Sequence, residues 1–402
     1  MTVNQIYTLM NTVTGEILGK TDLVAEDLSN VVDVGTELFN ATAVDNYVKS
    51  LVNHIGKVIF VNRPYSGKIP SVLMDSWEFG SVLEKISCDT PTAEENESWD
   101  LVDGQEYKQD IFYKPTVSAK FFNSKVTFEV PMSFTEKQVK ESFSNAAQLN
   151  GFISMIYNAV DRSMTIKIDS LVMRTINSMI AQTLNADKTD FTGGYGTAST
   201  PRCVNLLKLY NDEFFPAGTG GTANPDALTA DKAMLDKDFI RYASYIMGLY
   251  VDRLASISTL FNVGGKDRFT DAANLHFITL SDFAKSADVY LQSDVRHNEL
   301  TKLPNYETVP YWQGSGQAYD FADTSAINVK IDASTTVNIT GIIGVMFDRD
   351  ALGVANLDRR VTTAYNAKAE FFNNYYKFDA GYFNDTNENF VVFFVSDAKT
   401  GS

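Results

Sequence analysis

Histidine is the residue type that most often serves both acid–base catalysis and metal binding, and the chain has three histidines: His54, His276 and His297. A metalloprotease motif such as HExxH needs two of them four residues apart on one helix face. The three histidines here are far too widely separated for such a spacing. We therefore expect each one to pack in the fold or to lie on the surface, with no metal or cofactor bound.

Two glycine-rich stretches superficially suggest phosphate binding. Residues 264–267 read GGKD, but a phosphate loop requires an earlier glycine and a Ser or Thr after the lysine, and both are absent. Residues 218–221 read GTGG and lack the preceding strand and following helix of a dinucleotide site. We favour a turn for the first stretch and a surface loop for the second.

Carboxylates and aromatic rings suggest three more kinds of site. Residues 348–350 (DRD) could bind a cation, although a turn with ion pairs is favoured after so apolar a strand. The acidic run 94–97 (EENE) could chelate a divalent ion, but such runs more commonly form solvated loop tips. The run 371–378 (FFNNYYKF) could stack nucleic-acid bases, yet it has few basic neighbours, which favours packing in a sheet. The sequence thus predicts no enzyme active site.

The composition argues against several other classes of protein. A chain of 402 residues with 44% hydrophobic residues can build a large core, while a net charge of −16 argues against a surface that grips DNA. Cys88 and Cys203 are too few and too far apart for a disulfide framework, which fits a reducing cytoplasm. No signal-peptide pattern or apolar run of about 18 residues is visible, so neither export nor membrane spanning is expected.

The first third of the chain predicts a helix followed by strands. Apolar residues recur at helical spacing over 43–55. The stretch 57–131 has strand-forming limbs around an acidic middle, 84–110, with nine carboxylates and two lysines. This middle is too polar to supply its own core, so we expect a long β excursion that rests on something else.

A capped helix is predicted next. Ser133 and Glu136 have the capping-box spacing, and a helical apolar period then continues to Leu184. Asn150 and Gly151 could break this period, leaving a second helix of about thirty residues.

The rest of the chain mixes helices and strands. We expect a surface loop over 187–222, a helix over 230–260, and an alternation of strand and helix after it. The apolar run 337–348 (VNITGIIGVMFD) predicts one strand. Residues 359–396 read as two strands joined by a polar turn at 384–389, which predicts a hairpin.

The order of these elements resembles the Hong Kong 97-type fold of tailed-phage major capsid proteins. Residues 45–59 (DNYVKSLVNHIGKVI) also look like a stretch in capsid proteins of phi-twenty-nine-type podoviruses, and 344–353 and 362–366 are similar to the end of many phage capsid proteins. The resemblance implies an α+β fold with an N-terminal arm, an extended β E-loop, a long spine helix, a peripheral domain sheet and an axial domain. Its expected divisions are 1–56 (arm and short helix), 57–131 (E-loop), 132–190 (peripheral domain with spine helix), 191–355 (mainly axial domain) and 356–402 (return to the peripheral β-hairpin).

The resemblance further implies a major capsid protein that assembles with itself, as hexamers and pentamers, into an icosahedral or prolate head shell in the bacterial cytoplasm. Expected partners are a separate scaffolding protein, a portal protein and, at most weakly, packaged DNA, with no membrane. Only about 42 residues without heptads precede the predicted helix, so we expect the mature subunit to keep its N-terminus. A tail or receptor-binding protein is the alternative, although the β-rich repeats or heptads typical of those proteins are not evident.

Contacts between subunits are expected to pair acidic residues of the E-loop with basic residues on and near the spine helix. Each exposed pair contributes about 0 to 1 kcal/mol, so we expect the strength to come from many contacts per subunit and from apolar contacts of the loop's aromatic limb. The candidates are Glu94, Glu95, Glu97 and Asp100 on the loop, and Lys137, Lys140, Arg162, Lys167 and Arg174 on the helical part.

Overall fold

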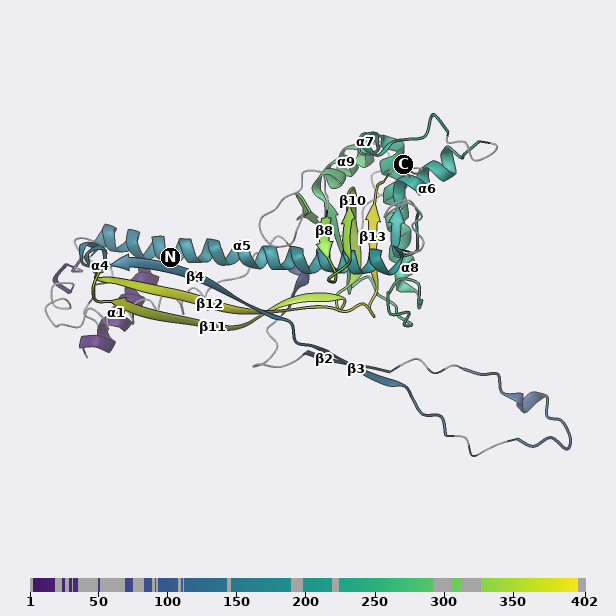
Figure 1. The fold of residues 1–402 in the computed structure, drawn as a ribbon, viewed down its shortest axis with the longest axis horizontal. Coiled ribbons are helices and arrows are strands. Elements are labelled where there is room, and N and C mark those ends of the chain that lie inside the picture. Colours follow the sequence, from purple (N-terminus) through teal and green to yellow (C-terminus); the bar gives the residue numbers. More distant parts are fainter. Residues whose placement is uncertain are drawn as a thin grey trace.

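The computed structural model shows a mixed α and β protein built along one long helix (Figure 1). It describes residues 3–18, 24–25, 29–30, 32–34, 50, 69–74, 83–88, 91, 93–107, 110, 112–142, 146–188, 198–218, 224–292, 306–312 and 327–396. The predicted helix at 43–55 lies outside these residues except for residue 50, as do His54 and His297.

The long helix, α5 (Ala146–Ala186), runs for 41 residues without interruption. The expected break at Asn150 and Gly151 is therefore wrong. A glycine inside a helix costs about 1 kcal/mol, but its neighbours Leu149 and Ile153 are both fully buried, and their burial outweighs that cost.

The N-terminal cap of the preceding helix, α4 (Glu136–Ser142), also differs from the prediction. Thr135 and Gln138 form the capping box: the Thr135 N–H donates to Gln138 Oε1 at 2.9 Å, and the Gln138 N–H donates to Thr135 Oγ1 at 3.2 Å. Ser133 instead lies in strand β4 (Lys125–Thr135), where its hydroxyl donates to Asn373 Oδ1 at 2.5 Å. The strand extends further than expected because β4 pairs with its neighbour as far as Thr135.

A four-stranded sheet lies beside the N-terminal half of α5 (Figure 1). Its order is β1 (Leu73–Met74), β11 (Leu352–Asn366), β12 (Phe371–Asn384) and β4. Side chains of β12 alternate between the two faces, and the buried set packs against α5 together with α1 (Val3–Leu18). The aromatic run at 371–378 is thus part of a sheet, as predicted.

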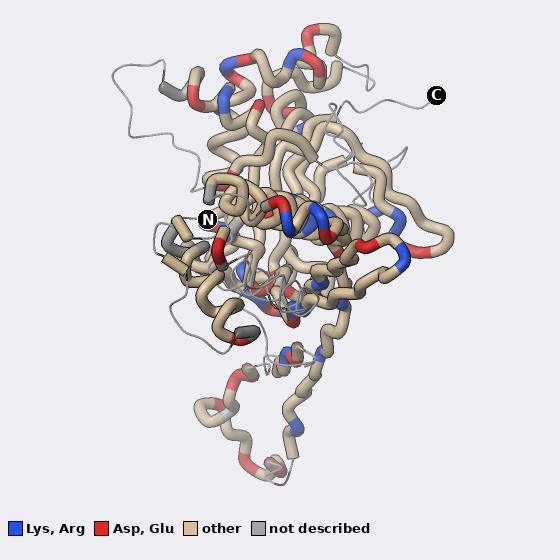
Figure 2. Tube along the Cα trace, turned by 90° about the vertical axis from the view of Figure 1, so that its left-hand side faces the viewer, with Lys and Arg blue, Asp and Glu red and all other residues tan. Residues whose placement is uncertain are grey.

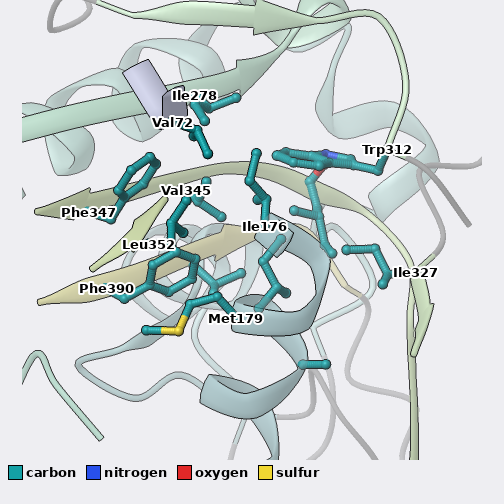
Figure 3. Close-up of a cluster of buried hydrophobic side chains, with 14 of the residues drawn as sticks. Val72, Ile176, Met179, Ile278, Trp312, Ile327, Val345, Phe347, Leu352 and Phe390 are labelled. Atoms are coloured by element: carbon teal, nitrogen blue, oxygen red, sulfur yellow. The ribbon is translucent and has the colours of Figure 1, made fainter. Parts of the chain in front are cut away.

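A five-stranded sheet covers the C-terminal half of α5. Its order is β5 (Cys203–Asn205), β13 (Phe390–Phe394), β10 (Ile342–Asp348), β6 (Leu275–Leu280) and β7 (Glu307–Val309). One face packs on α5 in a cluster that contains Ile176, Met179 and Trp312, whose indole N–H donates to the Ile342 carbonyl at 2.9 Å (Figure 3).

Three helices cover the opposite face of this sheet: α6 (Leu206–Phe214), α8 (Lys237–Ala255) and α9 (Ser281–Gln292). The helix predicted over 230–260 is split into α7 (Ala230–Ala233) and α8, because the Asp236 carboxylate caps α8 by accepting from the amides of Asp238 and Phe239. The strand at β6 and the helix at α9 confirm the alternation that was expected.

The predicted terminal hairpin is misplaced. The hairpin joins β11 and β12 through a turn at 367–370, whereas β12 and β13 belong to different sheets. All five residues of β13 are buried, Val392 toward α5 and Val391 toward the covering helices. A strand buried on both faces takes a central place in a covered sheet, and the polar turn at 384–389 leads from one sheet to the other.

The apolar run expected to form one strand is two strands. Strand β9 (Thr336–Ile339) pairs with β8 (Ile327–Lys330), and β10 begins after Gly341. Gly341 has φ 75°, and a Cβ there would meet the Val395 carbonyl oxygen at 2.1 Å, so only glycine fits the turn.

Candidate functional site

An extended two-stranded loop projects away from both sheets (Figure 1). Strands β2 (Leu83–Cys88) and β3 (Val117–Phe122) form its ladder, and a 3-10 turn, η2 (Glu97–Trp99), lies in its outer part. The described residues 93–107 are exposed where their side chains are described. The loop therefore has no core of its own.

Large apolar side chains are concentrated on this loop. Trp99 is 93% exposed and Phe112 is 85% exposed, the two highest values among the exposed large hydrophobic residues that the structure describes. An exposed apolar group of this size marks an interaction surface in a soluble protein. Among the loop residues that the structure describes, nine large hydrophobic residues are exposed: Ile86, Trp99, Leu101, Val102, Tyr107, Phe112, Tyr113, Val117 and Phe121.

The acidic candidates lie on the same loop. Glu94, Glu95 and Asp100 are exposed, and Figure 2 shows acidic residues along the projecting loop. Glu97 begins η2, and its side chain lies outside the described residues. The outer loop thus exposes aromatic side chains among acidic ones.

The basic candidates fall into two groups. Lys137, Arg162 and Lys167 are exposed, and no carboxylate in the described part of the chain forms an ion pair with them. The other two have partners within the chain. Lys140 pairs with Glu136 at 2.6 Å, and the guanidinium of Arg174 lies 5.7 Å from the centre of the Tyr382 ring.

The structure does not bring the acidic and basic candidates together within one chain. The loop leaves the molecule beyond the C-terminal half of α5, whereas α4 lies at the opposite end of α5 (Figure 1). A contact between the loop tip and the basic residues near α4 would therefore need a second copy of the chain.

Phe112 lies on the aromatic limb that was expected to make apolar contacts, whereas Trp99 and Leu101, within the acidic middle, were not predicted as contact residues. Their signal was present as large apolar residues within an acidic stretch, in no period that could bury them on one face.

Where the structure describes them, the remaining sites predicted from the sequence are turns or packed residues, and 219–221 of the second glycine-rich stretch lie outside the described residues. The Asp348 carboxylate accepts from the Thr270 hydroxyl at 2.7 Å and from the Asp350 amide at 2.9 Å, which makes 348–350 a turn held by hydrogen bonds. Residues 264–267 form a turn through Asn262, whose side chain accepts from the Lys266 amide at 2.8 Å. His276 is half-buried, and this burial lowers its pKa.

The described ranges contain neither a cluster of metal ligands nor a helix that could span a membrane. No group of three or more His, Cys, Asp or Glu residues there could hold a metal ion. None of the described helices is long and apolar enough to cross a membrane.

Comparison with known proteins identifies the class. A family model of phage major capsid proteins matches residues 10–394, which is nearly the whole chain. The protein is therefore a structural subunit of a bacteriophage head shell, located in the capsid of the virion. Within that class, the chain belongs to the Phi29-like phage major capsid protein family.

Solved capsid structures are similar to this chain at low identity. The capsid structure of Staphylococcus phage Andhra shares 8% identity with a TM-score of 0.46, covering 81% of this chain and 83% of that one. The mature capsid of bacteriophage PhiM1 shares 9% with a TM-score of 0.44, covering 83% and 89%. The capsid of Cyanophage P-SCSP1u shares 12% with a TM-score of 0.41, covering 81% and 87%. No curated protein matches the sequence.

Proposed function

We propose that this capsid protein assembles through its projecting loop, which docks on a neighbouring copy. The observation that supports this is the exposure of Trp99, Phe112 and their apolar neighbours in a loop that has no core. Covering such side chains with a partner removes their apolar surface from water, which stabilises the complex by about 25 cal/mol per Å² of apolar area. The acidic residues Glu94, Glu95, Glu97 and Asp100 would then lie near basic residues of the neighbour. These are Lys137, Arg162 and Lys167, together with Lys140 and Arg174, which also have partners within their own chain.

We further propose the Hong Kong 97-type assignment of the elements. In this assignment α5 is the spine helix, the four-stranded sheet is the peripheral domain and the five-stranded sheet with its helices is the axial domain. Residues 1–56 are the N-terminal arm. The E-loop is the part from 83 to 122, since β1 and β4 are hydrogen-bonded into the four-stranded sheet. The length of α5 supports this assignment.

The proposed divisions after the spine helix follow the sheets. Residues 191–355 belong mainly to the axial domain and 356–384 to the peripheral hairpin, while β13 returns to the axial sheet. The pairing of β13 with β5 and β10 supports this last point.

We also propose the partners that such a shell needs: copies of itself in hexamers and pentamers, a separate scaffolding protein and a portal protein, with assembly in the host cytoplasm. The net charge of −16 supports only weak contact with packaged DNA. Electron microscopy of the purified protein tests the assembly, because closed or tubular shells are expected, whereas elongated trimers would favour a tail or receptor-binding protein.

The docking role is tested by changing the loop tip while keeping its ladder. The variant Trp99→Ala with Phe112→Ala should fold with an unchanged thermal midpoint, since both side chains are solvated, and should fail to form shells. The matched control is Val289→Ala, which removes an apolar side chain that is 63% exposed on α9. Normal shells from the double variant would refute the docking role.

A further inference from the structure

Two lysines face each other at the base of the projecting loop. Lys85 of β2 is directly opposite Lys120 of β3 in the ladder. Like charges in such a pair destabilise an isolated ladder. Here both ammonium groups converge on one carboxylate: Lys85 Nζ lies 2.9 Å from Asp385 Oδ2, and Lys120 Nζ lies 2.9 Å from Asp385 Oδ1. The Asp385 carboxylate thus offsets the repulsion between the two ammonium groups and attaches both strands of the loop to its own turn.

This carboxylate is shielded from water. The Asp385 side chain is 3% exposed, whereas those of Lys85 and Lys120 are 23% and 38% exposed. Ion pairs with a buried partner are screened much less than surface pairs, and breaking one of them leaves a buried charge without its counterpart. The contact is therefore strong enough to hold a loop root in place.

Neighbouring groups add to the same attachment. Lys85 also pairs with Glu388 at 3.2 Å and donates to the Asp350 carbonyl at 2.9 Å. Glu388 pairs in turn with Arg268 at 3.1 Å. An apolar contact lies beside the charged groups, where the Phe122 and Phe383 rings have centroids 5.1 Å apart. The loop root is thus attached by both charges and rings.

The turn that carries Asp385 is itself fixed. The Asp385 amide donates to the Ala351 carbonyl at 2.7 Å, and the Gly264 amide donates to the Thr386 carbonyl at 2.9 Å. This turn links β12 of the four-stranded sheet to β13 of the five-stranded sheet. Through this turn, the base of the loop is therefore attached to both sheets.

We propose that Asp385 is a positioning residue for assembly: by holding Lys85 and Lys120, it fixes the direction in which the loop leaves the subunit before a neighbour binds it. The inference rests on the proposed docking role of the loop. An isolated two-stranded ribbon is marginally stable in water, so an unattached loop would sample many directions. A loop already held in one direction loses less conformational freedom on docking, which speeds association and strengthens it.

The experiment measures loop direction and assembly separately. Spin labels on cysteines placed at Asp103 and Asp252, with Cys88→Ser and Cys203→Ala as background, report the distance between the loop and α8 in the unassembled subunit by pulsed electron paramagnetic resonance. Asp385→Asn should broaden this distance distribution and slow shell formation roughly tenfold, as expected for the loss of charge-assisted hydrogen bonds. Asp212→Asn, which breaks the exposed Lys208 pair, is the matched control and should change neither.

A second variant distinguishes the loss of the loop contact from misfolding of the turn that carries Asp385. Lys85→Gln with Lys120→Gln alters only the loop side and should give the same broadening with an intact thermal transition. An unchanged distance distribution in both variants, or a broadened one with normal assembly, would overturn the positioning role. If Trp99→Ala with Phe112→Ala also assembles normally, the docking role fails as well; if that variant does not assemble, only the positioning role is lost.

Discussion

Asp187 and Arg202 form an ion pair that joins the end of α5 to the segment preceding β5. The Asp187 side chain is 3% exposed, and its carboxylate also accepts from the Thr200 hydroxyl at 2.6 Å. Arg202 in turn donates to the Asn262 carbonyl at 2.7 Å. The pair therefore links α5 to β5, the edge strand of the five-stranded sheet.

We expect Asp187→Asn to lower the free energy of unfolding by about 3 kcal/mol, because it leaves a largely buried guanidinium without its counter-charge. The exposed pair of Lys208 and Asp212 offers a comparison, in which Asp212→Asn should cost less than about 1 kcal/mol. Urea unfolding of the unassembled subunit measures both. Equal losses in the two variants would contradict the distinction.

The position of the α4 cap can be tested with two alanine substitutions. Thr135→Ala removes the side chain that accepts from the Gln138 amide and should cost about 1 kcal/mol. Ser133→Ala removes only an exposed contact with Asn373 and should cost less than half as much. Thermal unfolding compares the two, and a larger loss at Ser133 would restore the cap predicted from the sequence.

Two glycines should respond in opposite directions to alanine. At Gly341 the φ of 75° and the nearby Val395 carbonyl make Gly341→Ala destabilising by more than about 1 kcal/mol. At Gly151, inside α5, no atom lies within 4 Å of an added Cβ, so Gly151→Ala should stabilise by about 0.5–1 kcal/mol. Chemical denaturation of each variant gives the sign directly.

The loop root should release at acid pH in a defined order. Burial raises the pKa of Glu388 above its ordinary value of 4.5, despite nearby Lys85 and Arg268. Burial also opposes ionisation of Asp385, but hydrogen bonds from Lys85 and Lys120 outweigh it and hold the pKa below the ordinary 3.8. A carboxyl with a lowered pKa stabilises the fold above its unfolded pKa and stops doing so as the pH falls through its folded pKa.

Glu388 should therefore take up its proton first, which relieves the cost of burying its charge and leaves the loop in place. Release should follow only below pH 3.8, when Asp385 is protonated. The spin-label distance measured along a pH series checks this order. Broadening that is complete above pH 4.5 would show that Asp385 does not hold the loop.

The electrostatic part of docking is tested by reversing Glu94, Glu95 and Glu97 together to lysine. Assembly should slow or become irregular at low salt, and more so than for any single reversal. At 1 M salt, where surface charge reaches only about 3 Å, the triple variant and the parent should converge. Indifference to the triple reversal at low salt would leave the apolar contacts of Trp99 and Phe112 as the whole of the interaction.

The sequence predicted best the elements that have one clear apolar period. The course of α5 beyond residue 152 followed from residues such as Ile156, Val160 and Met164, all of which are buried. Strand β6 and helix α9 lie where an alternation of strand and helix was predicted. The misplaced hairpin shows the limit: a polar turn between two strands says where the chain bends, but not whether the next strand pairs with the last.

The attachment of the loop root could not be predicted. Lys85 and Asp385 are 300 residues apart, and each is an ordinary charged residue in its local sequence. Their pairing depends on a turn whose place is set by two sheets that come from distant parts of the chain. The acidic and basic candidates, in contrast, could be named from charge alone, but charge gives no information about which copy supplies each partner.

Helix α5 contributes to two of the three hydrophobic clusters formed by the described residues. Leu149 through Ile168 supply buried residues to the cluster under the four-stranded sheet, and Leu171 through Leu184 supply them to the cluster under the five-stranded sheet. At about 1.5 Å per residue the helix is about 60 Å long. Neither cluster can lose its packing without exposing part of the same continuous helix, so thermal unfolding of the two regions should be coupled into one cooperative transition despite their separate sheets.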